Sequence, residues 1–118
     1  MRSQNLVGYF TLHNDMIHLF KNQKSKHKWE LDDDLEYFPA IKVHFFGVDD
    51  RFREKGYGEY LLTQVFRISI ALSRNTGCNF IVLESLHSET SFYEKYGFRR
   101  KSKGILFDDM IINIKDLL

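Results

Sequence analysis

The sequence predicts a single α/β domain of mixed α+β character, in which helices flank a mixed sheet with a central pair of parallel strands. Three observations support this prediction. A chain of 118 residues has the size of one domain. Two strongly apolar segments, residues 40–48 and 79–85, are separated by a segment with helical periodicity. The order strand, helix, strand requires a crossover connection, which makes the two strands parallel.

The composition is that of an ordinary globular protein. Hydrophobic residues make up 43% of the chain and charged residues 28%, with one Pro and seven Gly, which excludes a disordered or collagen-like protein. A formal net charge of +1 gives no overall attraction to nucleic acid or to an anionic membrane. Cys78 is the single cysteine, so no internal disulfide is expected and a reducing, cytoplasmic compartment is favoured. No apolar run is long enough for a membrane span or a signal peptide.

The first part of the chain predicts a β-hairpin. Leu6–Leu12 and Met16–Phe20 have strand composition, and the turn formers His13, Asn14 and Asp15 separate them. A lysine-rich stretch over residues 21–28 and an acidic stretch over residues 32–36 follow. We interpret these two charged stretches as a solvated excursion rather than a binding patch.

The middle of the chain predicts a strand, a long helix and a second strand. Ala40–Val48 has few polar breaks, which is typical of a central strand covered on both faces. From Glu59 apolar residues recur at helical spacing, and Gly77 is expected to end the helix. The centre of the apolar helix face is predicted at Leu61, Val65, Ile68 and Leu72, widened by Leu62, Phe66 and Ile70. Asn79–Ser85 is the second buried strand.

The last part predicts a short helix and one or two strands. Ser88 is expected to cap a helix over residues 89–96, which Gly97 ends. Met110–Ile114 is the clearest strand of the tail. A run of basic side chains before it is interpreted as an exposed strand edge protected by charge, the alternative being contact with a phosphate; the run comprises Arg99, Arg100, Lys101 and Lys103.

The segment with the strongest chemical signal is the loop of sequence REKGYG, residues 53–58, between the central strand and the long helix. Gly56 and Gly58 permit positive φ and a close backbone approach, and the following helix presents free N–H groups. Such a loop suits a phosphate, although an ordinary tight turn has the same spacing. The Walker A pattern is absent, and Leu61 stands where a dinucleotide fingerprint needs its third Gly.

Two motifs together resemble the GNAT N-acetyltransferase superfamily. The [QR]xxGx[GA] signature of its motif A is matched by Arg53, Gly56 and Gly58, and SETSFYEKYGF, residues 88–98, resembles its motif B. The resemblance covers roughly residues 40 to 100, and the expected hairpin would supply two further family strands. Full-length members begin with a strand and two helices before these strands, so the resemblance implies an N-terminally shortened member, a fragment, or one that completes its site as a homodimer.

The resemblance implies acetyl-coenzyme A as the cosubstrate and no metal. The pantetheine arm would pair with the strand edge at Phe46, Gly47 and Val48. Main-chain amides at the start of the helix would hold the pyrophosphate; these belong to Arg53, Glu54, Lys55, Gly56, Tyr57, Gly58 and Glu59. Tyr93 matches the family tyrosine that protonates the leaving thiolate.

The resemblance leaves the general base and the acceptor open. Lys42 stands where some members carry a Glu base, and His44 on the same strand face is interpreted as a buried structural histidine. His13, His18 and His27 do not cluster as metal ligands, and Cys78 is interpreted as a small buried residue. The favoured function is direct acetyl transfer to an unidentified amine. The alternatives are a non-catalytic acyl-coenzyme A binding or regulatory remnant, and a toxin-type acetyltransferase acting on aminoacyl-tRNA.

Overall fold

The computed structural model describes residues 8–26, 29, 31, 35–48 and 57–118. Within these ranges five strands form one mixed sheet in the order β1-β2-β3-β5-β4. The pair β2–β3 is parallel and the other neighbours are antiparallel, so the predicted fold class is confirmed. The elements are β1 (Gly8–His18), α1 (Lys21–Lys26), β2 (Tyr37–Val48), α2 (Tyr57–Thr76), β3 (Phe80–Leu86), η2 (His87–Glu89), α3 (Thr90–Lys95), β4 (Arg99–Lys103), β5 (Phe107–Asn113) and η3 (Ile114–Leu117).

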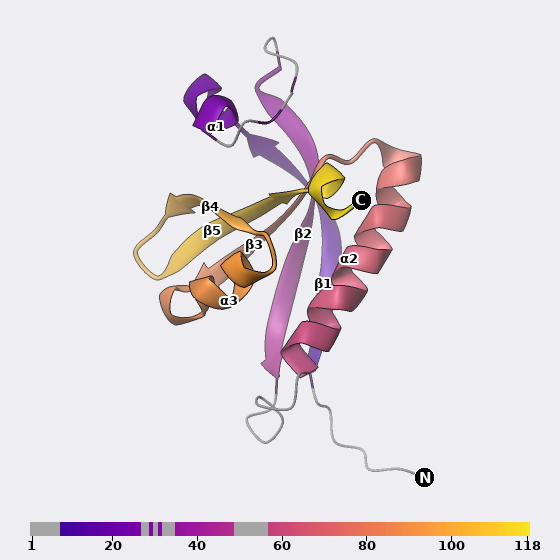
Figure 1. Ribbon diagram of the computed structural model, residues 1–118, viewed down its shortest axis with the longest axis vertical. Helices are drawn as coiled ribbons and strands as arrows, with labels where there is room; N and C mark the ends of the chain where they lie inside the picture. The colour runs from indigo at the N-terminus through magenta and orange to yellow at the C-terminus, as the bar shows by residue number, and fades with distance from the viewer. Residues whose placement is uncertain (1–7, 27–28, 30, 32–34, 49–56) are drawn as a thin grey trace.

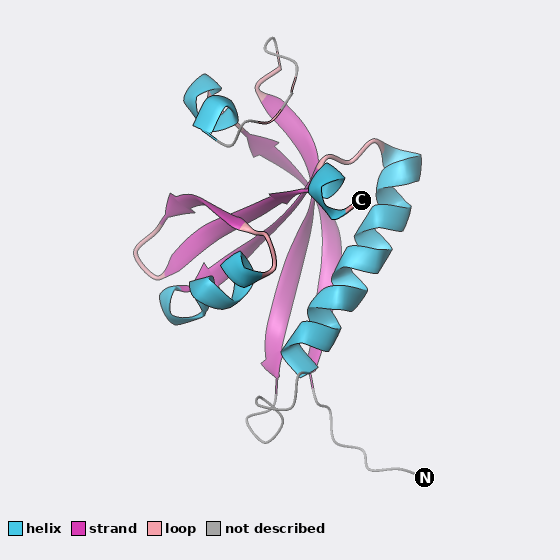
Figure 2. Cartoon of the chain, in the orientation of Figure 1, coloured by secondary structure: helices cyan, strands magenta, loops and turns pink. Residues whose placement is uncertain are grey.

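Helices α2 and α3 cover one face of the sheet, and the strands diverge from one another (Figures 1 and 2). On this face α2 and α3 pack onto the middle strands through one core cluster, to which Val43, Leu62, Leu83 and Tyr93 belong. A second cluster lies on the opposite face, where Trp29 packs beside buried side chains of β1, β2, β3 and β5. The start of β3, from Phe80 to Leu83, is therefore buried on both faces, as its continuous apolar sequence predicts, whereas Lys42 of β2 and Glu84 of β3 are partly exposed on the second face.

The predicted hairpin at the start of the chain is wrong. Residues 13–15 do not turn: β1 runs without interruption from Gly8 to His18. It pairs with β2 along this length, with His13 opposite Lys42 and Asp15 opposite Ala40. Turn-forming residues have only a weak local preference, and a long antiparallel partner strand outweighs it.

The charged excursion after β1 is only partly solvated. Lys24 of α1 is 5% exposed, and its ammonium donates a hydrogen bond to the carbonyl oxygen of Leu35 at 2.9 Å. The same ammonium lies 5.7 Å from the centre of the Phe38 ring. The aliphatic stem of a lysine can cover apolar surface when its charged end finds an acceptor, which is why this residue departs from the prediction. Residues 32–34 of the acidic stretch lie outside the described residues.

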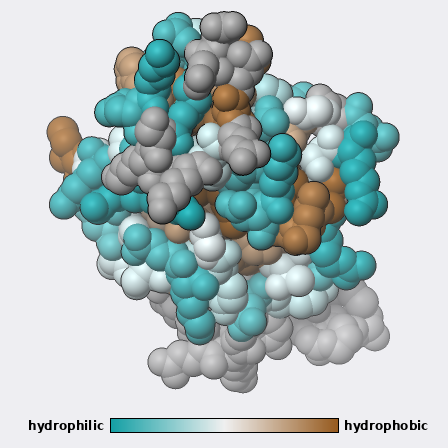
Figure 3. Space-filling view, turned by 45° about the horizontal axis from the view of Figure 1, so that its top comes forward, coloured by the Kyte–Doolittle hydropathy of each residue, from teal (hydrophilic) through white to brown (hydrophobic). Residues whose placement is uncertain are grey.

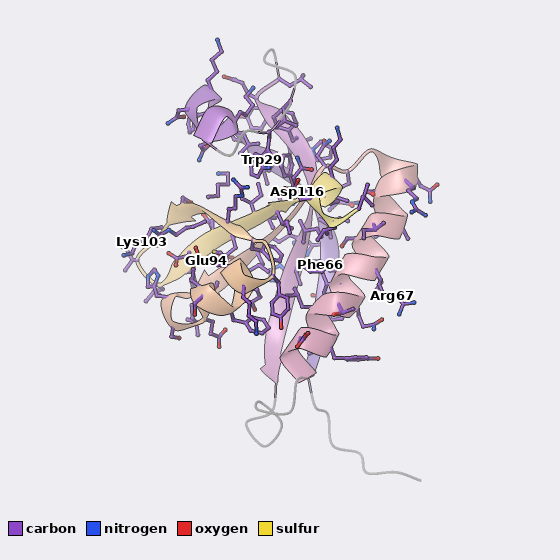
Figure 4. The ribbon with its side chains drawn as sticks, viewed as in Figure 1. Trp29, Phe66, Arg67, Glu94, Lys103 and Asp116 are labelled. Atoms are coloured by element: carbon purple, nitrogen blue, oxygen red, sulfur yellow. The ribbon has the colours of Figure 1, made fainter. Side chains whose placement is uncertain are left out.

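The long helix is confirmed, but its buried face is rotated from the predicted one. Leu62, Val65 and Ser69 are buried, whereas Ile68 and Leu72 are each 41% exposed. Phe66 points toward the sheet and Arg67 points away from it (Figure 4). Because apolar residues occupy more than one side of this helix, contact with the sheet chooses which side is buried.

Two glycines end helices as predicted. Gly77, with φ of 69°, follows α2, and Gly97, with φ of 102°, follows α3. The predicted Ser88 cap is wrong, because residues 87–89 form a 3₁₀ turn and the cap positions of η2 and α3, Leu86 and Glu89, make no side-chain cap hydrogen bond.

We expect Gly97→Ala to lower the free energy of unfolding by about 1–3 kcal/mol, because an L-residue rarely adopts positive φ. The added Cβ would also lie 3.1 Å from Ile112 Cδ1, inside the core. The matched variant Gly77→Ala meets nothing within 4 Å, so it should cost less. Urea denaturation measures both variants. A Gly97→Ala protein as stable as the wild type would show that the tight contact with Ile112 is relieved at no cost.

The basic strand β4 lies at the edge of the sheet, as its charged sequence predicts. Apolar side chains are nevertheless exposed in the following turn, where Ile105 is 95% and Leu106 68% exposed. Figure 3 shows one face of the molecule, on which apolar side chains lie among hydrophilic ones. No helix of the described residues is long and apolar enough to cross a membrane.

Candidate functional site

The parallel strands β2 and β3 separate part of the way along their length. Their register pairs Ala40 with Phe80 and ends where Val43 pairs with Leu83. Both strands continue, since β2 runs to Val48 beside β1 and β3 runs to Leu86 beside β5. The two strands therefore diverge from this point, and Figure 1 shows them spreading apart. A gap at the carboxyl ends of parallel strands is a common place for a ligand.

An irregularity in β2 lies at the predicted pantetheine-binding residues. Phe10 pairs with Phe45 and Gly8 with Val48, so β2 advances three residues while β1 advances two. Phe46 and Gly47 lie in this bulge, and Val48 ends the strand. A bulge leaves one residue without a ladder partner and often lies next to an active site. The three residues are thus placed on the part of β2 that has separated from β3.

The long helix begins close to the end of β2. Tyr57 is its first residue, and Gly58 and Glu59 follow in its first turn. Gly58 is helical and does not use the positive φ that a glycine permits; the described glycines with positive φ are Gly77 and Gly97. The free amides and the positive end of the helix dipole remain available to an anion here. Arg53, Glu54, Lys55 and Gly56 of the predicted pyrophosphate loop lie outside the described residues.

Tyr93 lies on α3 and packs in the core cluster that also holds the last paired residues of β2 and β3. Its side chain is 7% exposed and belongs to the same core cluster as Val43 and Leu83. Burial, assisted by the negative charge of Glu89, raises the pKa of Tyr93 to about 12. The phenol therefore holds its proton at neutral pH, as a proton donor requires.

The neighbouring Tyr96 has a different environment. It is half-buried, and burial together with a hydrogen bond to the Glu59 carboxylate raises the pKa of its phenol. A Cβ at Gly58 would lie 3.6 Å from Phe92 Cζ, and the rings of Phe92 and Tyr96 have centres 5.2 Å apart. These contacts hold the start of α2 beside α3.

A buried carboxylate that the sequence prediction missed anchors the start of α3. Asp108 of β5 is 2% exposed, and its Oδ2 accepts a hydrogen bond of 2.6 Å from the Thr90 hydroxyl. Its Oδ1 lies 3.1 Å from His87 Nδ1, and Arg100 lies 3.9 Å from Oδ2. The hydrogen bond from Thr90 and the contact with His87 lower the pKa of Asp108. This network ties α3, and with it Tyr93, to the sheet.

His87 faces an acceptor with each ring nitrogen. Nε2 lies 3.1 Å from the carbonyl oxygen of Ile105, and Nδ1 faces Asp108. Only the doubly protonated ring can donate to both acceptors. The bond to Ile105, with the bond to Asp108, accordingly raises the pKa of His87.

This pair predicts a pH dependence of stability. Because the pKa of His87 is raised in the folded protein, the protonated ring stabilises the fold. This stabilisation is fully present below pH 6.5, the ordinary pKa of histidine, and is lost as pH rises through the folded-state pKa. Because the pKa of Asp108 is lowered in the folded protein, the ionised carboxylate stabilises the fold. This stabilisation is present above pH 3.8, the ordinary pKa of the group, and is lost as pH falls through the folded-state pKa. Thermal melts should therefore show a larger advantage of wild type over His87→Gln at about pH 5.5 than at about pH 8.5. An advantage that grows with pH would contradict this sign.

The remaining candidates from the sequence fall into two groups. Lys42 and His44 share the sheet face opposite Tyr93; Lys42 Nζ lies 3.3 Å from Glu84 Oε1, and the Nε2 atoms of His44 and His13 are 3.2 Å apart. His44 is half-buried rather than fully buried as predicted. Cys78 is also partly buried, and burial raises the pKa of its thiol, which disfavours a reactive thiolate. Within the described ranges no three His, Cys, Asp or Glu side chains could hold a metal ion together.

Several solved structures of toxins share the fold of this chain. A bacterial toxin superimposes with a TM-score of 0.79 at 16% identity, over 94% of this chain and 62% of the toxin. The toxin AtaT complexed with acetyl-methionyl-tRNAfMet gives 0.75 at 20% identity, over 94% and 64%. A tyrosine-to-phenylalanine mutant of KacT gives 0.75 at 21% identity, over 95% and 66%. The chain thus has the fold of these toxins and spans about three fifths of the length of the first of them.

No curated protein matches the chain. The acetyltransferase (GNAT) domain family matches residues 7–100, which is most of the chain and includes both motifs that the sequence analysis identified. The fold, the parted parallel strands and this family match agree with one another. The chain therefore belongs to the GNAT acetyltransferase family.

Proposed function

We propose that this chain transfers the acetyl group of acetyl-coenzyme A to an amine by direct attack. The observation that carries the proposal is the separation of β2 and β3 after Val43 and Leu83, two residues that share one core cluster with Tyr93. The separated part of β2, from residue 44 to residue 48, is about 16 Å long at 3.3 Å per residue. That length gives an extended acyl arm a backbone edge to pair with, between the first turn of α2 and Tyr93.

The residues present suit the two ends of this cosubstrate. The amides at Gly58 and Glu59 and the helix dipole suit the pyrophosphate, and we assign the amides of residues 53–57 to the same group from the sequence motif. The bulge at Phe46 and Gly47 offers backbone groups that can pair with the acyl arm and polarise the thioester carbonyl. Tyr93, with its pKa at about 12, returns a proton to the sulfur as the thiolate leaves.

Two measurements test the proposal. Isothermal titration calorimetry with acetyl-coenzyme A measures binding, and release of free coenzyme A thiol in the presence of primary amines measures transfer. Binding with amine-dependent thiol release supports an acetyltransferase. Binding without release by any amine would favour the non-catalytic acyl-coenzyme A binding module instead. Absence of binding would overturn both.

A second candidate acceptor is the amino group of an aminoacyl-tRNA. It is favoured by the likeness to AtaT, which has been seen with acetyl-methionyl-tRNAfMet, and by the exposed basic edge strand β4. The net charge of +1 limits the basic surface to such local patches. Acetylation of charged tRNA, assayed by the release of N-acetyl amino acids, tests this acceptor directly.

The setting of the reaction is part of the same proposal. We place residues 1–118 in one acetyltransferase domain that works in the cytoplasm, where a single unpaired cysteine stays reduced. The exposed edge of β1 makes a homodimer the proposed assembly. Light scattering at tens of micromolar, a rough working range for weak interfaces, measures the assembly.

A further inference from the structure

The sheet face opposite α2 and α3 has a cavity that the proposed donor site does not use. Its volume is about 220 Å³, and its charged and ionisable lining comes from all five strands: Asp15, His18, Lys42, Glu84, Lys101 and Asp109. This volume is below the roughly 300–1,000 Å³ of most small-molecule sites. It therefore suits a narrow group, such as the end of an alkyl amine, rather than a whole bulky ligand.

The cavity meets the donor site at the point where the parallel strands separate. Side chains alternate between the two faces of a strand. Val43 and Leu83, the last paired residues, pack with Tyr93 on one face. Lys42 and Glu84, their neighbours in sequence, therefore point to the other face, where both line the cavity. A thioester at this point would have Tyr93 on one side and the Lys42–Glu84 pair on the other.

Among the described residues, the cavity side offers the open approach to such a thioester. On the other face the core cluster closes the approach, since Val43, Leu62, Leu83 and Tyr93 are all less than 10% exposed. On the cavity face, the side chains of Lys42 and Glu84 are 28% and 47% exposed. An incoming amine therefore meets these two side chains first.

Glu84 differs from the other two carboxylates of the cavity. Asp109 Oδ2 accepts a hydrogen bond from the Ser102 hydroxyl at 2.6 Å, and Asp15 Oδ1 accepts one from the Met16 amide at 2.8 Å. Glu84 instead holds the ammonium of Lys42 at 3.3 Å. Since Lys42 is itself a primary alkylammonium, this contact shows the chemistry that a primary amine acceptor would make with the same carboxylate.

We infer that Glu84 is the residue that binds the acceptor ammonium and accepts its proton, and that the acceptor is a primary amine entering through this cavity. The inference rests on the proposed acetyl transfer and adds the residue that binds the acceptor and the route by which the acceptor enters. It also supplies the base that the sequence leaves open: the carboxylate comes from β3, two residues beyond the Lys42 partner Val82, and lies 3.3 Å from the Lys42 ammonium.

The proton balance of the step is simple. The ammonium gives one proton to Glu84, and the free amine attacks the thioester carbon. The new N–C bond forms and the C–S bond breaks, while the nitrogen loses its second proton. Tyr93 donates its proton to the departing sulfur, the second proton from nitrogen passes to water, and a proton from water restores the phenol. Glu84 then releases the first proton to water.

The test compares two nucleophiles with the full chain. Propylamine is protonated at neutral pH and needs a base, whereas hydroxylamine is largely neutral there and does not. Glu84→Gln should lower kcat/KM for propylamine about 100- to 10,000-fold, the usual worth of general base assistance. The same variant should keep the rate with hydroxylamine and the affinity for acetyl-coenzyme A within about threefold, since the base is what it loses. Asp116→Asn, an equally conservative change at an exposed position of η3 outside the cavity, should alter neither rate by more than that.

Four results would overturn the inference, three of them without touching the proposed function. Equal losses with both nucleophiles would mean that Glu84 is structural, and a propylamine rate near that of wild type would mean that it is not the base. A propylamine-specific loss in His44→Gln but not in Glu84→Gln would assign the base to the neighbouring histidine. Wild-type protein that transfers acetyl groups to neither nucleophile would instead overturn the proposed function, and the assignment of Glu84 with it.

Discussion

A Tyr93→Phe protein should fold and bind acetyl-coenzyme A like the wild type, yet transfer the acetyl group about 100- to 10,000-fold more slowly. The substitution removes a single oxygen from a side chain that is 7% exposed and packed by its ring against Phe92 and Phe98. The ring contacts survive, so the core should keep its packing. What the substitution removes is the hydroxyl that we propose as the proton donor.

The effect is large because a thiolate is a poor leaving group until it is protonated. Burial and the charge of Glu89 raise the pKa of Tyr93 to about 12, so the phenol is protonated throughout the physiological range. Its loss should therefore reduce the rate at every pH in that range rather than shift a pH optimum. Thiol release at saturating acetyl-coenzyme A measures this rate.

Tyr96→Phe provides the matched control on the same short segment. Tyr96 is half-buried and its hydroxyl bonds to Glu59, at the start of α2 rather than at the separation of the strands. This variant should retain most of the wild-type turnover. A Tyr93→Phe protein with the turnover of the wild type would assign Tyr93 to the core alone.

Gly58→Asp should weaken acetyl-coenzyme A binding by about 100-fold or more, because a carboxylate placed against the pyrophosphate costs several kcal/mol. Gly58 lies in the first turn of α2, where the helix presents free amides. An acidic residue is favourable in the first turn of a helix, so the variant should keep its fold. Calorimetry measures the affinity, and circular dichroism verifies the helix.

Gly58→Ala separates bulk from charge. Its Cβ would lie 3.6 Å from Phe92 Cζ, an ordinary contact, so the alanine variant should fold and lose much less affinity than the aspartate variant. Gly56→Asp, in the part of the loop outside the described residues, is expected to behave like Gly58→Asp, and Arg53→Ala should matter less than either. Unchanged affinity in both folded aspartate variants would place the pyrophosphate elsewhere.

The sequence by itself determined the central strand–helix–strand unit. Residues 40–48 and 79–85 are apolar without alternation, and the segment between them has helical periodicity, so each element follows from a pattern that is local in the chain. The same is true of Gly77 and Gly97, since positive φ is a property of the residue and its own backbone. The two GNAT motifs are also local, and the family match over residues 7–100 confirms them.

Tertiary structure alone decided the features that depend on a partner distant in sequence. β1 passes straight through the turn formers at residues 13–15 because its pairing with β2 continues before and after them. The rotation of α2 and the burial of Lys24 depend in the same way on surfaces formed elsewhere. In the sequence, Glu84 is one more residue of a segment that predicts a buried strand. Only the pairing of β2 with β3 brings its carboxylate within 3.3 Å of the Lys42 ammonium, on the face opposite Tyr93. A linear pattern reports the preference of each segment, whereas the contacts between segments are fixed when the sheet assembles and buries its two faces.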